Sequence, residues 1–256
     1  MAEHRGTALV RRPGPRLAEG IVTHIARTPV DVERAYAQHA AYRAALAEAG
    51  WAVREVAPAP ELADAVFVED TVVVMGDLAV LTRPGAGGRR AEVDGTREAL
   101  AGLGLEVVEV AAPGTLDGGD VLQVGDRVYV GSGGRSDAGG IAQLAGFAAT
   151  RGRTVVPVPL RGVLHLKSAV TALPDGTLIG LPHLVDPAAL PPLRTAPEEP
   201  GAHVVPLGGK ACLIAASAPE TARLLAADGW TPIVVDVSEF EKLEGCVTCL
   251  NVLIAN

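Results

Sequence analysis

The chain alternates between segments with helical spacing of apolar residues and short apolar runs that are typical of strands. Four segments have the helical spacing, and each is followed directly by a short β-rich run. Several of them end at glycine, a residue that often follows the last turn of a helix. We therefore expect four helix–strand pairs, with helices over residues 32–50, 89–104, 137–152 and 219–229.

After each of these strands the chain passes through a polar junction into a pair of apolar runs that read as a hairpin. The clearest pairs are "VFVEDTVVVMGDLAVLTRPG", "TLDGGDVLQVGDRVYVGSGG" and "HLKSAVTALPDGTLIGLP", with a weaker one in "GGKACLIAASAPE". The final run "GCVTCLNVLI" could close on the N-terminal run "TALVRRPG", and the Pro-rich stretch 182–200 reads as a long loop. Good hairpin turn residues stand at Gly76-Asp77, Gly125-Asp126 and Asp175-Gly176.

The junctions recur at a nearly constant spacing. Asp70 and Asp120 are 50 residues apart, and Asp120 and Ser168 are 48 apart. Such a period favours a closed radial array of repeats over the alternative, an open α/β sheet with hairpin insertions. In a closed array, equivalent junctions face one central channel. We therefore expect four junctions to converge: Glu69-Asp70, Asp117–Asp120, His165–Lys167 and Cys246–Cys249.

The converging junctions supply cysteine, histidine and carboxylate, which are the groups that nucleophilic catalysis needs. In "LDGGD" the two acids flank a Gly-Gly turn, and we expect a site role for at least one of them. In "VFVEDTVVV" two acids interrupt an apolar strand pattern, so one of Glu69 and Asp70 should face the packed side. A buried carboxylate needs a cationic partner, which is either a protein arginine or a bound guanidinium or ammonium.

Two of the three cysteines, Cys246 and Cys249, have the spacing of a metal clip or a redox pair. A zinc site would need further ligands, and Cys212 is 34 residues away from Cys246 with no neighbouring ligand. A thioredoxin-like pair opens a helix, whereas the run after Cys249 is β-rich. We expect Cys249 to be a single nucleophile and Cys246 a packing residue. If both residues are extended, strand alternation places them on opposite faces.

Composition narrows the possible partners. The 256 residues are 48% hydrophobic, enough for a packed core, and we expect one domain over residues 1–256. The net charge of −8 argues against nucleic acid, and no run is long and apolar enough for a signal peptide or a membrane span. Three cysteines do not suit a disulfide framework, so we expect a cytoplasmic protein.

Several stretches together resemble the dimethylarginine dimethylaminohydrolases, a family of guanidino-modifying enzymes. They are "FVED", "TRPGAGGRR", "TLDGGDVL", "GVLHLKSAV" and "EFEKLEGCVTCLNVLI", in the family's order over essentially the whole chain. The resemblance implies a five-bladed α/β propeller (pentein) of ββαβ repeats with pseudo-fivefold symmetry. It implies hydrolysis of Nω,Nω-dimethyl-L-arginine, or of the monomethyl compound, to L-citrulline and dimethylamine or methylamine through a covalent cysteine thiouronium intermediate. No cofactor or metal is implied.

The resemblance also implies roles for individual residues. The catalytic set falls on the nucleophile Cys249, on His165 and on Asp117, which orients the imidazole. Substrate-binding roles fall on Asp64, Glu69 and Asp70 for the guanidinium and on Arg89 and Arg135 for the α-carboxylate. Main-chain contacts fall on the N-terminal loop around Leu17 to Val22 and on Leu243.

Alternative functions remain open at the level of sequence. An arginine deiminase or another guanidino hydrolase would share the Cys–His–Asp triad. Arginine deiminases resemble one another in a His-x-Asp pattern at this place. This chain has His165-Leu-Lys167 instead, which favours methylated arginine. A non-catalytic binding module would not need Cys249 and His165 together, and metal analysis would identify a zinc protein. A homodimer is left open by the sequence.

Overall fold

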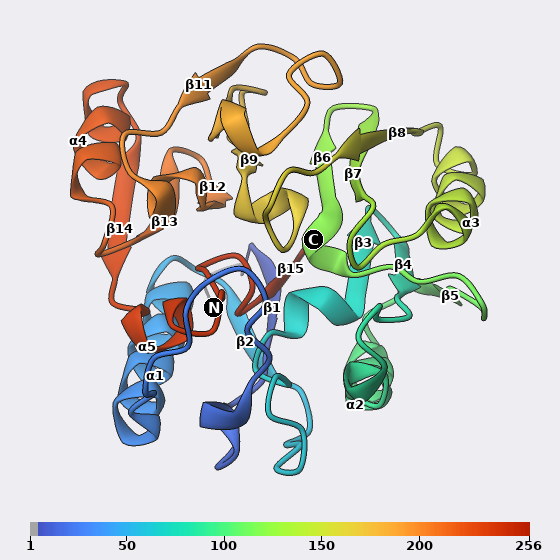
Figure 1. The fold of residues 1–256 in the computed structure, drawn as a ribbon, viewed down its shortest axis with the longest axis horizontal. Helices are drawn as coiled ribbons and strands as arrows, with labels where there is room; N and C mark the ends of the chain where they lie inside the picture. Colours follow the sequence, from blue (N-terminus) through green and yellow to red (C-terminus); the bar gives the residue numbers. More distant parts are fainter. Residues whose placement is uncertain (1–4) are drawn as a thin grey trace.

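The strands form five separate three-stranded sheets in the computed structural model, which describes residues 5–256. The sheets lie around a common centre (Figure 1). Their strand orders are β3-β4-β5, β6-β7-β8, β9-β10-β11, β12-β13-β14 and β15-β1-β2. In every sheet the middle strand is antiparallel to the first strand of this order and parallel to the third. One supersecondary unit is therefore repeated five times.

The strands have the following bounds: β1 (Gly6–Val10), β2 (Ala52–Glu55), β3 (Val72–Met75), β4 (Leu78–Leu81), β5 (Glu106–Glu109), β6 (Val121–Val124), β7 (Arg127–Ser132), β8 (Thr154–Pro159), β9 (Val170–Ala172), β10 (Leu178–Gly180), β11 (Leu193–Thr195), β12 (Val204–Gly208), β13 (Ala211–Ala215), β14 (Thr231–Val235) and β15 (Val252–Ala255). The α-helices are α1 (Val32–Glu48), α2 (Glu92–Leu100), α3 (Ala138–Ala149), α4 (Pro219–Ala227) and α5 (Ser238–Glu241). Short 3₁₀ turns occupy Leu17–Glu19, Val68–Thr71, Gly87–Arg89, Gly118–Asp120, Leu166–Ser168, Pro182–Leu184 and Glu199–Ala202.

The predicted helix–strand pairs are confirmed, with small shifts at their ends. Each of α1 to α4 connects the middle strand of a sheet to its third, parallel strand, as such a crossover requires. The expectation of a loop over 182–200 was wrong in part, because this stretch contains β11. That strand has three residues and one apolar side chain, so its pattern is too short to recognise.

The sheet that contains both ends of the described chain closes the ring. β15 pairs antiparallel with β1, from Gly6 opposite Ala255 to Leu9 opposite Val252, as the sequence predicted. The predicted hairpin turns are also present. Gly76 and Gly125 both have left-handed backbone angles, with φ of 64° and 59°, as two-residue hairpin turns demand.

The first strands of the five sheets face the centre. All five, β3, β6, β9, β12 and β15, contribute residues to one cavity of about 270 Å³. A short turn precedes each of them: Val68–Thr71, Gly118–Asp120, Leu166–Ser168, Glu199–Ala202 and, before β15, residues 247–250. The polar junctions of the sequence lie in or next to these turns. Because each turn precedes the inner strand of its sheet, the repeat places the junctions at the same end of the channel.

Buried Arg11, just after β1, joins the first repeat to the second. Its guanidinium donates to the carbonyls of Ala57 (3.1 Å), Ala65 (3.2 Å) and Glu92 (2.8 Å). Burial lowers the pKa of Arg11, and the nearby charge of Glu92 works in the opposite direction. Within residues 5–256, no helix has both the length and the apolar character needed to cross a bilayer.

We predict that Arg11→Met lowers the free energy of unfolding by about 3 kcal/mol, because three carbonyls lose a buried cationic donor. Arg12→Met is the control, since the Arg12 side chain is 62% exposed and its ion pair with Glu55 lies at the surface, where it contributes ~0–1 kcal/mol. Urea denaturation of both variants measures the difference. Equal losses would contradict the role given to Arg11.

Candidate functional site

A small polar pocket lies at the junction end of the channel. Its volume is about 20 Å³, which is room for a single water molecule. Its titratable residues include Asp70 and Arg89 from the repeat of β3, β4 and β5, His165 from the junction before β9, and Cys249 from the turn before β15. The lining consists of Ile21, Asp64, Phe67, Asp70, Arg89, Arg135, Leu164, His165, Leu243, Glu244, Gly245 and Cys249.

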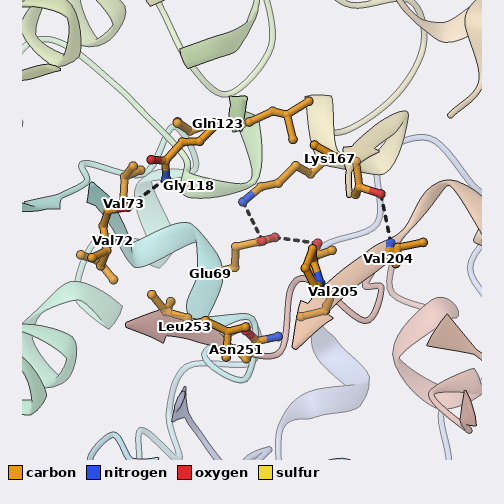
Figure 2. A pocket seen from close by; sticks show the side chains of 18 residues that line it. Glu69, Val72, Val73, Gly118, Gln123, Lys167, Val204, Val205, Asn251 and Leu253 are labelled. Carbon is orange, nitrogen blue, oxygen red and sulfur yellow. Dashed lines mark hydrogen bonds and ion pairs between the residues drawn. The ribbon is translucent and has the colours of Figure 1, made fainter. Parts of the chain in front are cut away.

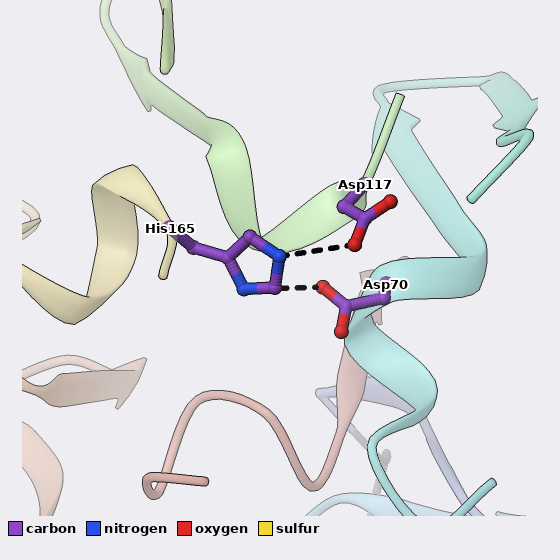
Figure 3. Close-up of side chains that lie close together, drawn as sticks. All are labelled: Asp70, Asp117 and His165. Atoms are coloured by element: carbon purple, nitrogen blue, oxygen red, sulfur yellow. Dashed lines mark hydrogen bonds and ion pairs between the residues drawn. The ribbon is translucent and has the colours of Figure 1, made fainter. Parts of the chain in front are cut away.

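His165 is a buried imidazole that faces two carboxylates (Figure 3). Its Nε2 lies 3.0 Å from Oδ2 of Asp117, and its Nδ1 lies 3.7 Å from Oδ1 of Asp70. Burial alone would lower the pKa of His165, but the charges of Asp70, Asp120 and Asp117 outweigh it and raise the pKa to about 9. The ring is therefore an imidazolium at neutral pH, and it can donate a proton.

Asp117 lies behind the imidazole and is fully buried. One carboxylate oxygen accepts from the backbone N–H of Gly85 (2.8 Å), and the other faces His165. The Gly-Gly pair after Asp117 is needed for this packing: a Cβ on Gly119 would lie 2.5 Å from Nδ1 of His165. The tight turn in "LDGGD" thus serves the close approach of the histidine.

Asp120, the second acid of "LDGGD", positions the loop that carries His165. Its carboxylate accepts from the Ser136 hydroxyl (2.6 Å) and from the N–H of Leu166 (3.1 Å). Burial raises the pKa of Asp120 to about 6. Of the two acids, Asp117 contacts the imidazole and Asp120 supports it.

Asp70 is tied to a buried ion-pair network. Arg89 donates to Asp70 (2.6 Å) and to the carboxylate of Glu92, and also to the carbonyls of Asp64 and Phe67. Burial would raise the pKa of Asp70, but His165 and Arg89 lower it to about 2. Asp70 is therefore ionised, and its cationic partner is a protein arginine, which was one of the two options left open by the sequence. Arg89 lines the pocket while most of its donors are engaged.

Arg135 is the more accessible arginine of the pocket. Its side chain is 16% exposed, and it lies 3.8 Å from Asp117 and 3.4 Å from the Thr23 hydroxyl. A guanidinium with free donors suits bidentate recognition of a carboxylate.

An N-terminal segment covers the pocket. The N–H of Ile21 donates to Asp64 (3.0 Å), and the N–H groups of Thr23 and His24 donate to the carboxylate of Glu244, both at 2.6 Å. Glu244 adopts a left-handed φ of 60°, which is uncommon for a residue with a side chain. These bonds hold the segment closed over Asp64.

The stretch around Leu17 to Val22, from which main-chain contacts are expected, reaches the pocket at Ile21, and Leu243 also lines the pocket. Leu17, the first residue of a 3₁₀ turn, is buried in the core, and Val22 packs against the same core. Glu244 was missed from the sequence, since only the fold shows that residues 23 and 24 reach it.

Glu69 points away from this pocket, into the central cavity on the other side (Figure 2). Its carboxylate pairs with Lys167 (2.7 Å) and accepts from the Thr248 hydroxyl (3.0 Å). Burial raises its pKa, while Lys167 works to lower it. Because Val68–Thr71 is a 3₁₀ turn and not a strand, both acids are buried and face different partners. The structure thus does not bring Glu69 to the pocket that contains Cys249.

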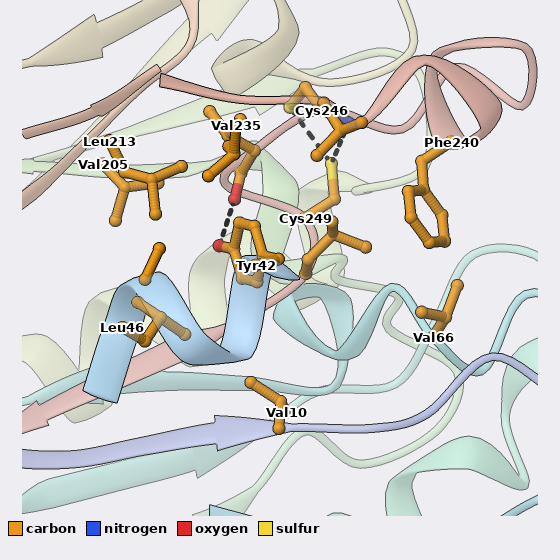
Figure 4. Close-up of a cluster of buried hydrophobic side chains, with 14 of the residues drawn as sticks. Val10, Tyr42, Leu46, Val66, Val205, Leu213, Val235, Phe240, Cys246 and Cys249 are labelled. Carbon is orange, nitrogen blue, oxygen red and sulfur yellow. Dashed lines mark hydrogen bonds between the residues drawn. The ribbon is translucent and has the colours of Figure 1, made fainter. Parts of the chain in front are cut away.

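The two cysteines lie together in a turn, and the expectation that they occupy opposite faces of a strand was wrong. Their sulfur atoms are 3.2 Å apart, and the N–H of Cys246 donates to Sγ of Cys249 (3.4 Å; Figure 4). The strand β15 begins only at Val252. Tyr42 in α1 donates to the carbonyl of Val247 (2.6 Å) and thereby holds the turn in place.

A metal ion has one possible set of three ligands among residues 5–256: Asp70, Asp117 and His165. Their oxygen and nitrogen atoms already contact one another, and Asp70 and Asp117 also accept from Arg89, Gly119 and Gly85. The cluster is thus satisfied as a hydrogen-bonded network.

The chain is similar to known proteins over nearly its full length. It is 58% identical over 246 residues to the N(G),N(G)-dimethylarginine dimethylaminohydrolase of Streptomyces coelicolor, covering 96% of this chain and 95% of that one. It is 31% identical over 248 residues to the enzyme of the same name from Pseudomonas aeruginosa, covering 95% of this chain and 97% of that one. No family model matches the chain.

Solved structures agree in fold. A dimethylarginine dimethylaminohydrolase adduct with S-methyl-L-thiocitrulline has a TM-score of 0.91 at 29% identity and covers 97% of this chain and 99% of that one. The Pseudomonas aeruginosa enzyme complexed with citrulline has a TM-score of 0.89 at 29% identity, covering 98% of this chain and 100% of that one. The chain is thus a hydrolase with a mixed α/β fold. It belongs to the dimethylarginine dimethylaminohydrolase family.

We predict that Lys167→Met lowers the free energy of unfolding by about 2 kcal/mol, because the buried Glu69 carboxylate then loses its cationic partner. The double variant Lys167→Met/Glu69→Gln should recover to within about 1 kcal/mol of the unsubstituted protein, since no unpaired charge is left. Urea denaturation measures both. A double variant as unstable as the single one would show that the two side chains do not depend on each other.

Proposed function

We propose that this chain hydrolyses Nω,Nω-dimethyl-L-arginine, and the monomethyl compound, to L-citrulline and dimethylamine or methylamine. The observation that carries the proposal is that one pocket is lined by a thiol, an imidazolium and three carboxylates, those of Asp64, Asp70 and Glu244. We also propose that the five sheets are the blades of an α/β propeller with pseudo-fivefold symmetry, formed by one domain over residues 1–256. A cytoplasmic location stays a prediction from the sequence.

Cys249 is the proposed nucleophile. Resonance makes a guanidinium carbon a poor electrophile, so attack requires a thiolate. Without substrate, the pKa of Cys249 is raised well above its ordinary value by its hydrogen bond with Cys246, by burial, and by the charges of Glu69 and Asp70. A cationic guanidinium in the pocket supplies the opposite charge and favours the thiolate. Substrate binding thus activates the thiol that attacks it.

His165 is the proposed acid and base. After Cys249 attacks, the imidazolium protonates the departing amine, which leaves poorly as an anion. The neutral imidazole then takes a proton from water, which attacks the thiouronium carbon and releases citrulline. The carboxylate of Asp117, 3.0 Å from Nε2, orients the ring and stabilises its charged form.

Asp70 and Asp64 are proposed to hold the guanidinium, and Arg135 the α-carboxylate. Both acids line the pocket, and burial raises the pKa of Asp64, so a cation beside it would favour its ionised form. Arg89 already holds Asp70 in place through a charge-assisted hydrogen bond. Glu69 takes a structural place with Lys167 in this scheme.

Substrate entry requires the covering segment to move. A pocket of about 20 Å³ has no room for an amino acid, and the Ile21 N–H occupies an oxygen of Asp64. Breaking the bonds from residues 21, 23 and 24 would open the pocket and free Asp64 for the guanidinium.

A product assay with three proteins tests the proposal. Incubated with Nω,Nω-dimethyl-L-arginine, the unsubstituted protein should release citrulline and dimethylamine in equal amounts. Cys249→Ala should lose at least ~10⁴-fold in rate, because the nucleophile is absent. The matched variant Cys246→Ala should keep most of the activity, since its backbone N–H still contacts position 249.

Other outcomes would overturn parts of the proposal. Ammonia from L-arginine, with the dimethyl compound untouched, would identify an arginine deiminase with the same triad. Retained activity in Cys249→Ala would exclude it as nucleophile, and complete loss in Cys246→Ala alone would assign that role to Cys246.

A further inference from the structure

The close pair of thiols in the turn before β15 is not needed for the hydrolysis described above. Sγ of Cys246 lies 3.2 Å from Sγ of Cys249, and it also lies 3.3 Å from the Thr248 hydroxyl. Hydrolysis at Cys249 requires one thiolate and a histidine, so the second thiol has no assigned role. Cys212, the third cysteine, lies in a different cluster of the core.

The turn already has the backbone geometry of a disulfide. The N–H of Cys249 donates to the carbonyl of Cys246 (3.1 Å), so the two residues are the ends of a four-residue turn. Such a turn brings its first and last Cα atoms within about 7 Å, and disulfides span about 4.4–6.8 Å between Cα atoms. Bond formation needs the two sulfur atoms to approach by about 1 Å from their present 3.2 Å, toward an S–S length of about 2.05 Å.

The two sulfur atoms differ in access and in ionisation. Cys249 lines the pocket and Cys246 is not part of its lining, so a small reagent that enters the pocket meets Cys249 first. The hydrogen bond from Cys249 lowers the pKa of Cys246 well below its ordinary value. The contact lets the two sulfur atoms share one proton, so that each can act as the thiolate in turn.

We propose that Cys246–Cys249 is an oxidation site for hydroperoxides, in which Cys246 acts as the resolving thiol. Cys249 passes its proton across the 3.2 Å contact to Cys246, its sulfur attacks one peroxide oxygen and the O–O bond breaks. The products are a sulfenic acid and hydroxide or alkoxide, which takes up a proton to become water or an alcohol. The Cys246 sulfur then attacks the sulfenic sulfur, the S–O bond breaks, hydroxide leaves as water, and an S–S bond forms. The peroxide is reduced by two electrons, and the two thiols are oxidised by two.

The disulfide would both stop hydrolysis and protect the Cys249 sulfur from further oxidation. Cys249 in a disulfide has no thiolate to attack a guanidinium. A sulfenic acid without a nearby thiol proceeds to sulfinic acid, which a thiol reductant does not reverse. With Cys246 beside it, Cys249 returns to the thiol when a dithiol reduces the bond.

The experiment compares the full chain with Cys246→Ala and with Cys212→Ala after treatment with hydrogen peroxide. Trypsin cleaves after Lys242, so both cysteines of the pair fall in one peptide, residues 243–256, whose mass reports the chemistry. In the unsubstituted protein and in Cys212→Ala, this peptide should lose the mass of two hydrogen atoms. In Cys246→Ala it should gain oxygen atoms instead.

Activity after reduction is the second readout. Dithiothreitol should restore the unsubstituted protein and Cys212→Ala, whereas Cys246→Ala should recover at least ~10-fold less, because its nucleophile is oxidised beyond the sulfenic acid. Should Cys246→Ala fail to fold, Cys246→Ser replaces it.

Two results would overturn the inference. One is a peptide 243–256 from the unsubstituted protein that gains oxygen without losing two hydrogens. The other is equal recovery of Cys246→Ala and the unsubstituted protein. The mass readout does not depend on the proposed hydrolysis, so a failure of that function is seen separately.

Discussion

A chain of buried ion pairs runs from Glu92 through Arg89 and Asp70 to His165. It connects the repeat of β3, β4 and β5 to the junction before β9. Replacing any one of these charged side chains by a neutral one would leave its partner as an unpaired charge in a low-dielectric interior, which is strongly unfavourable. Asp70, a member of this chain, also helps to keep the imidazole protonated: together with Asp117 and Asp120 it raises the pKa of His165 to about 9. Stability and the acid form of His165 thus come from one arrangement.

Glu69 and Asp70 are neighbours in the sequence but line two different spaces near the centre of the ring. Asp70 belongs to the pocket with Cys249, whereas Glu69 pairs with Lys167 in the larger cavity lined by the five inner strands. The Thr248 hydroxyl donates to Glu69, and Thr248 stands next to Cys249 in the turn. The ion pair in the larger cavity therefore also holds the turn that carries the thiol, and each of the two spaces contributes to placing the nucleophile.

The sequence could predict three features: the repeat, the closure of the ring by β15 and β1, and the convergence of the junctions. Each of them follows from local apolar patterns that recur at a regular spacing along the chain. The direction of Glu69 could not be predicted, since residues 68–71 form a 3₁₀ turn where the apolar pattern suggested a strand. The contact of Cys246 with Cys249 was missed for the same reason. The bonds from residues 23 and 24 to Glu244 join positions about 220 apart, and no local signal reports such a contact.

The central claim is that Cys249 forms a covalent bond to the guanidinium carbon and that an amine leaves before water attacks. Acid quenching within the first turnover of Nω,Nω-dimethyl-L-arginine, followed by mass analysis of peptide 243–256, measures this directly. The expected result is an added mass equal to the substrate less dimethylamine, located on Cys249 by fragmentation. Citrulline formed while this peptide is never modified, or an adduct on Cys246, would contradict it.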